Sequence, residues 1–84
     1  MGGEVIVVFR ILPDTIENFE SVKKQCESLK PDRLEVEPIA FGLNALKLTK
    51  IIPDGPGVMD KLENEINAIK GLGSAENIFT TRAL

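Results

Sequence analysis

The run Glu4–Leu12 (EVIVVFRIL) limits the possible folds of this chain more than any other segment, because it is apolar on both of its alternating faces. β-Branched residues dominate the run and Pro13 ends it, which predicts a β-strand over residues 4–12. A strand that is apolar on both faces is typical of the middle of a sheet. The remaining segments must therefore supply strands for both of its edges.

Two segments place apolar residues at helical spacing. Before the first, Asp14 is the predicted N-cap and Glu17 stands three residues later, as in a capping box; Pro31 ends this helix. Its apolar stripe consists of Ile16, Phe19, Val22, Cys26 and Leu29. The second helix follows the loop 54–57, and Gly71 is its predicted C′ residue. Its apolar stripe consists of Met59, Leu62, Ile66 and Ile69.

Three further strands are predicted from alternation and from the residues that end it. Residues 34–37 read as a strand with one solvated face, and the following Pro38 favours an edge position. Residues 45–52 form the next strand. Residues 76–81 form the last and least apolar one, after which residues 82–84 are expected to be a free end.

The resulting order, β-α-β-β-α-β, is that of a split-βαβ or ferredoxin-like α+β fold. Right-handed crossovers place the first and third strands in the middle of a four-stranded antiparallel sheet, with both helices on one face. At 84 residues, the chain is expected to be a single domain over residues 1–84.

The composition argues against catalysis, metal binding and nucleic-acid binding. The chain has no histidine, so it lacks the commonest general base and metal ligand, and its single cysteine, Cys26, lies on an apolar stripe as a core residue. We therefore expect no enzyme, cofactor or metal site. The net charge of −3 also argues against direct nucleic-acid binding. The lack of a signal-peptide pattern and of a long apolar run predicts a soluble, cytoplasmic protein without membrane contact.

The other polar features have ordinary interpretations. The many carboxylates alternate with lysines on predicted solvent faces, where Glu35 and Glu37 are expected to pair across strands with Lys47. The loop Gly55-Pro56-Gly57 is not followed by Gly-Lys-Ser/Thr and so is not a phosphate-binding loop. An RNA-binding sheet remains an alternative, although Phe9 is the only aromatic residue on the two central strands. A ferredoxin-like module that senses a metabolite at a dimer interface is the other alternative.

The turn Pro38-Ile39-Ala40-Phe41-Gly42-Leu43 is unusual because it is uncharged and apolar. In one interpretation, Phe41 folds back onto the core and Gly42 supplies a positive φ. In the other, Phe41 is presented to a protein partner, as binding hot spots often are. The residues alone leave both interpretations open.

Residues 38–46, Pro-Ile-Ala-Phe-Gly-Leu-Asn-Ala-Leu, resemble the signature of the archaeal elongation factor 1-beta family. The similarity extends to the start of the chain, Met-Gly-Gly-Glu-Val, to Pro13, to the loop before Gly57 and to Ile69-Lys70-Gly71-Leu72. It implies a ferredoxin-like translation factor that exchanges GDP for GTP on the GTPase elongation factor 1-alpha.

The resemblance also implies which residues contact this GTPase. Phe41 occupies the place of the family's turn aromatic, within the partner-binding segment Pro38–Leu43. A basic residue near the C-terminus approaches the magnesium and phosphate region, and Arg82 is the nearest candidate. Eukaryotic members have a lysine next to last, where this chain has Ala83. Arg82 therefore either takes this role or makes an ordinary interface salt bridge. The free chain is expected to be a monomer.

Overall fold

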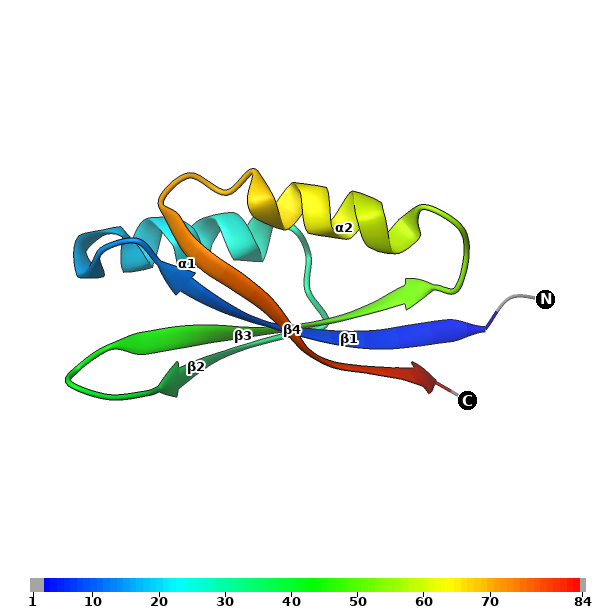
Figure 1. Ribbon diagram of the computed structural model, residues 1–84, viewed down its shortest axis with the longest axis horizontal. Coiled ribbons are helices and arrows are strands. Elements are labelled where there is room, and N and C mark those ends of the chain that lie inside the picture. Colours follow the sequence, from blue (N-terminus) through cyan, green and yellow to red (C-terminus); the bar gives the residue numbers. More distant parts are fainter. Residues whose placement is uncertain (1–2, 84) are drawn as a thin grey trace.

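The predicted order of elements is confirmed by the computed structural model, which describes residues 3–83 (Figure 1). Within these residues, the elements are β1 (Glu4–Pro13), a 3₁₀ turn η1 (Ile16–Asn18), α1 (Phe19–Ser28), β2 (Arg33–Pro38), β3 (Asn44–Pro53), α2 (Val58–Asn67) and β4 (Leu72–Ala83). Prolines lie at the ends of β1, β2 and β3, where the loss of a backbone donor costs least.

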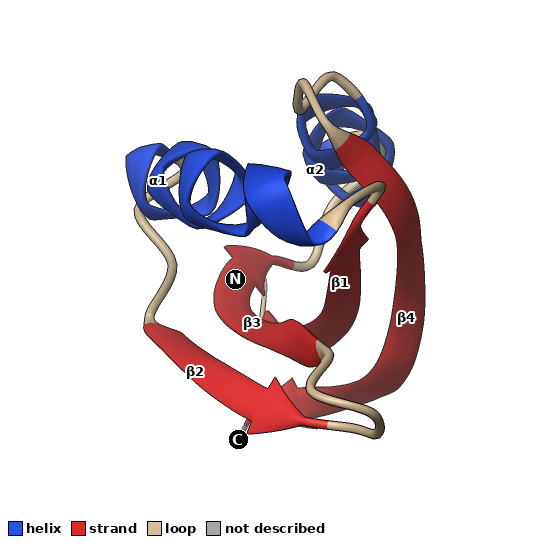
Figure 2. Cartoon of the chain, turned by 90° about the vertical axis from the view of Figure 1, so that its left-hand side faces the viewer, coloured by secondary structure: helices blue, strands red, loops and turns tan. Residues whose placement is uncertain are grey.

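The strands form one antiparallel sheet in the order β2-β3-β1-β4. As predicted, β1 and β3 are the central strands and β2 is an edge strand. Figure 2 shows α1 and α2 side by side over one face of the sheet, which is the ferredoxin-like arrangement. The register places Phe9 opposite Leu48 and Ile11 opposite Leu46, so the apolar faces of both central strands point towards the helices.

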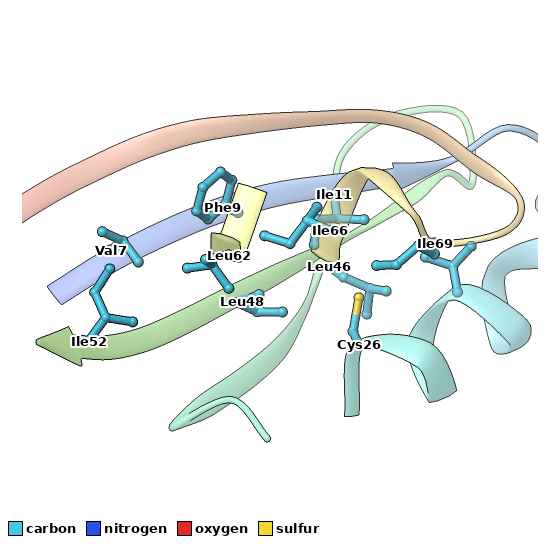
Figure 3. Packing of buried hydrophobic residues seen from close by; sticks show 11 residues of the cluster. Val7, Phe9, Ile11, Cys26, Leu46, Leu48, Ile52, Leu62, Ile66 and Ile69 are labelled. Carbon is cyan, nitrogen blue, oxygen red and sulfur yellow. The ribbon is translucent and has the colours of Figure 1, made fainter. Parts of the chain in front are cut away.

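The core lies between this face of the sheet and the two helices (Figure 3). The central strands contribute Val7, Phe9, Ile11, Leu46, Leu48 and Ile52, and the helical layer contributes Val22, Cys26, Leu62, Ile66 and Ile69. Ile11, Leu46 and Leu48 are completely buried. Burial of a large aliphatic side chain stabilises the fold by about 1.5–3 kcal/mol, so this layer supplies the main favourable term in folding.

Cys26 is a core residue, as predicted. Its side chain is completely buried, and burial, together with the nearby charge of Glu27, raises the pKa of its thiol from 9.0 to about 11. The thiolate is the reactive form of cysteine, so Cys26 is a packing residue at neutral pH.

The predicted capping box at the first helix is wrong. The chain enters α1 through η1, whose N-cap is Thr15 and lacks a side-chain capping hydrogen bond. Asp14 instead accepts a hydrogen bond at Oδ1 from Nδ2 of Asn18 over 2.6 Å, and its backbone N–H donates to the carbonyl of Gly71. The Asp14 carboxylate therefore bonds to a side chain rather than to free backbone N–H groups.

Gly71 is not the C′ residue of the second helix, because α2 ends at Asn67 and Ala68 is its C-cap. Gly71 lies further along, in the connection to β4, with a φ of 86°. β4 is also longer than predicted: it pairs with β1 from Leu72 to Ala83, with two shifts in register. Arg82 and Ala83 are thus strand residues rather than a free end, and Leu84 lies outside the described residues.

The expected ion pairs with Lys47 are also absent from residues 3–83. Glu35 does lie directly opposite Lys47 in the sheet, but its carboxylate is 3.7 Å from Nε of Arg33. Glu37 instead accepts a hydrogen bond from Nε of Arg10 over 3.1 Å. Each of the two carboxylates contacts an arginine instead, whose planar guanidinium presents several donors.

Candidate partner-binding site

The hairpin between β2 and β3 carries the larger part of the predicted site, residues 38–43, and its tip is a tight turn at one end of the molecule (Figure 1). The N–H of Leu43 donates to the carbonyl of Ala40, and the N–H of Ile39 donates to the carbonyl of Leu43, both over 2.9 Å. The two central residues, Phe41 and Gly42, have φ values of 53° and 76°. Two positive φ values are the mark of a type I′ turn.

Phe41 points into solvent, with 99% of its surface exposed. The interpretation in which Phe41 folds back onto the core is therefore wrong, whereas the positive φ predicted for Gly42 is confirmed. A left-handed conformation costs a residue other than glycine about 1–2 kcal/mol, and here no burial offsets that cost. Phe41 thus combines backbone strain with full exposure of an aromatic ring. Both are unfavourable for the isolated chain.

The turn is flanked by further exposed apolar side chains. Ile39 is 44% and Leu43 is 42% exposed, and Ile16 of η1, which lines a surface groove together with these two residues, is 66% exposed. The sequence did not indicate that Ile16 is exposed, because its spacing fits the apolar stripe of the first helix. Its position before the first α-helical turn is the signal that separates it from the core residues of that stripe.

Arg82 lies on β4, opposite Val5, at the other end of the sheet. Its Nη1 is 3.2 Å from Oδ2 of Asp54, in the loop that follows β3. The Arg82 side chain is 78% exposed and that of Asp54 is 39% exposed, so solvent screens this pair and it adds little to stability. The guanidinium is accessible for other contacts.

The fold does not bring the two parts of the predicted site together. Arg82 pairs with Val5 near the start of β1, whereas Gly42 and Leu43 lie beside Pro13 at its end. The eight residue steps from Val5 to Pro13, at about 3.3 Å each, separate the two parts by about 25 Å. Figure 1 shows the hairpin and the end of β4 at opposite ends of the molecule, whose long axis extends 44 Å.

Residues 3–83 lack the features of three other kinds of site. No group of three or more metal-ligating side chains occurs among them, and neither helix has the length and apolar character needed to cross a bilayer. Phe9, the aromatic residue of the central strands, is 3% exposed beneath the helices, so it is not available for stacking on a base.

A family model and several curated proteins that match this chain all point to one family. Residues 6–81 match the family model of the EF-1 guanine nucleotide exchange domain. Proteins named elongation factor 1-beta are similar over nearly the whole chain. The one from Methanoregula boonei is 38% identical, covering 94% of this chain and 96% of the relative. The one from Saccharolobus solfataricus is 40% identical and covers 94% of each. The one from Thermoplasma acidophilum is 39% identical, covering 90% and 96%.

The family match contains both the hairpin tip with Phe41 and nearly all of the paired length of β4. The chain therefore belongs to the family of EF-1 guanine nucleotide exchange domains, and it is a translation elongation factor that acts as a nucleotide exchange factor.

Proposed function

We propose that the chain binds the GTPase elongation factor 1-alpha and accelerates the release of its GDP, so that GTP rebinds. In this proposal, residues 1–84 act as one domain in the cytoplasm and are monomeric when free. The contact surfaces are the segment Pro38–Leu43 and, at the other end of the sheet, Arg82. The chain forms and breaks no covalent bond, because it acts by binding alone.

The observation that carries this proposal is the strained, fully exposed Phe41 at the tip of the hairpin. Tightly packed aromatic residues dominate many protein–protein interfaces, and a turn whose backbone is already fixed by hydrogen bonds loses little backbone entropy on binding. A partner that weakens nucleotide binding must bind the nucleotide-free GTPase more tightly by the same free energy. Phe41 is the side chain best placed to supply such a differential contact.

Arg82 supplies the second contact in this proposal. Its exposed guanidinium carries the charge type that competes with a metal ion for phosphate oxygens. Because the two contacts lie about 25 Å apart along the strands, the GTPase must meet the long side of the domain rather than one of its ends.

The direct test uses elongation factor 1-alpha from the same organism, loaded with a fluorescent GDP analogue. Adding the chain together with excess unlabelled GTP is expected to accelerate the loss of fluorescence in proportion to the concentration of the chain. Bovine serum albumin at the same concentration controls for non-specific effects. An unchanged release rate at saturating concentrations would contradict the proposal.

Replacing Arg82 with alanine is expected to lower the maximal rate of GDP release by about tenfold, with little change in melting temperature, because the ion pair is solvated. Asp54→Ala is the matched control: it breaks the same ion pair but keeps the cation, and is expected to retain full exchange. Equal loss in both variants would show that the ion pair matters and that Arg82 does not contact the GTPase.

A further inference from the structure

A groove of about 230 Å³ lies beside the hairpin tip, between the segment that joins β1 to α1 and the start of β3. Its apolar walls are formed by Leu12, Pro13, Ile16, Phe19, Ile39 and Leu43. The groove is open to solvent, and three of these side chains, Ile16, Ile39 and Leu43, expose more than two fifths of their surface. An apolar hollow surrounded by exposed aliphatic side chains is a surface suited to binding a protein.

The charge on the lining of this groove is negative. Asp14 is the charged residue among those that line it, and Glu17 follows directly on Ile16. No lysine or arginine belongs to the lining. The Asp14 carboxylate is exposed and accepts one hydrogen bond, from Asn18, so it retains acceptor capacity for a cation. The groove therefore favours an apolar group that has a positive charge beside it.

The size of the groove also limits what it holds. Pockets for small-molecule ligands usually span about 300–1,000 Å³ and enclose most of the ligand, so a smaller hollow of about 230 Å³ suits one or two side chains better than a metabolite. It is also continuous with the Phe41 turn, because Ile39, Gly42 and Leu43 belong to both. A protein that contacts Phe41 covers the groove as well.

We infer that the groove receives an apolar side chain of elongation factor 1-alpha that has a lysine or arginine next to it, the cation pairing with Asp14. Phe41 projects from this chain into the GTPase, and the GTPase projects a side chain back into this chain. Such reciprocal packing fixes the orientation of the two proteins more tightly than one projecting ring alone. This inference rests on the proposed function.

The apolar part is tested by the affinity for nucleotide-free elongation factor 1-alpha, measured by isothermal titration calorimetry. Ile16→Ala removes one wall of the groove, and Ile16→Trp fills the groove. Both are expected to raise Kd about tenfold. Ile51→Ala is the matched control: Ile51 is 40% exposed but lies on β3, on the sheet face away from the helices, and Kd is expected to stay unchanged.

The charge is tested by Asp14→Asn, which can still accept the hydrogen bond from Asn18 but loses the negative charge. We expect Kd to rise several-fold at low salt and this difference to shrink as the salt concentration rises. Glu27→Gln, at the far end of α1, removes one charge of the same sign and controls for the net charge of the domain.

The outcomes separate this inference from the proposed function. If the Ile16 and Asp14 variants bind with wild-type affinity while a Phe41 variant binds more weakly, the groove does not receive a GTPase side chain. The proposed function is unaffected by that result. Wild-type affinity in all of them, the Phe41 variant included, would overturn the groove and the contact role of Phe41. No binding of the unaltered chain to the nucleotide-free GTPase would overturn the proposed function as well. A photoreactive benzoylphenylalanine at position 16 is expected to cross-link to a GTPase segment that contains a basic residue; cross-linking to a second copy of this chain instead would also overturn the inference.

Discussion

Replacing Phe41 with asparagine is expected to slow chain-stimulated GDP release by about 10- to 100-fold while making the free domain more stable. The loss of exchange follows from removal of the exposed ring. The gain in stability follows from the backbone, because Phe41 has a φ of 53° in a type I′ turn, where Asn-Gly is the favoured pair. A gain of about 1 kcal/mol raises the melting temperature of a domain of this size by about 4–8 °C.

Because exchange is expected to fall while stability rises, Phe41→Asn is more informative than Phe41→Ala. A substitution that damages the fold lowers both the rate of GDP release and the melting temperature. Replacing a contact residue in a strained turn lowers the rate of GDP release but raises the melting temperature. Fluorescent-nucleotide release and thermal unfolding monitored by circular dichroism measure the two effects. Phe79→Thr is the control: Phe79 is 53% exposed on β4, outside the hairpin, and exchange is expected to survive its loss. A lower melting temperature with normal exchange in Phe41→Asn would return Phe41 to a packing role.

Replacing Leu46 with alanine is expected to lower the free energy of unfolding by about 2–5 kcal/mol. Leu46 is completely buried on β3, opposite Ile11, in the layer beneath the helices. Because an 84-residue domain has a total stability of about 4–12 kcal/mol, this loss removes a large share of it, and at the lower end of that range it unfolds much of the protein.

Urea unfolding is the measurement for Leu46→Ala, with a lower midpoint and an unchanged m-value expected. Ile51→Ala is the control, because it removes a large aliphatic side chain from the same strand but from the opposite, more exposed face. Its expected cost is below about 1 kcal/mol. Equal costs for the two variants would contradict the division of β3 into a buried and an exposed face.

The sequence was informative wherever one local pattern determines the structure. Alternation ended by proline located β1 and β3 to within about a residue, and the two apolar faces of β1 indicated its central position. The start of β4 was missed because Gly73 and Ala75 have low strand propensity. Pairing with the full length of β1 overrides that propensity, and a register shift opposite Val8 and Phe9 breaks the alternation.

The site was harder to predict than the fold because it depends on directions and distances. Composition marked residues 38–43 as unusual, but the direction of the Phe41 side chain depends on two positive φ values that the letters alone do not give. Ile16 has the spacing of a core residue, and only the 3₁₀ entry into α1 leaves it exposed. The separation of Phe41 from Arg82 follows from the antiparallel pairing of β1 with both β3 and β4.

The distance between Phe41 and Arg82 affects which conformation of a GTPase the domain binds most tightly. β1 is a central strand, hydrogen-bonded on both sides from one end of the sheet to the other, so the spacing of the two proposed contacts is fixed. If both contacts form at once, the domain binds best to the conformation of elongation factor 1-alpha in which the two complementary surfaces stand at this spacing. It then shifts the GTPase towards that conformation by no more than the difference in affinity between the two states. On this view, the length of a β-strand determines which GTPase conformation is selected.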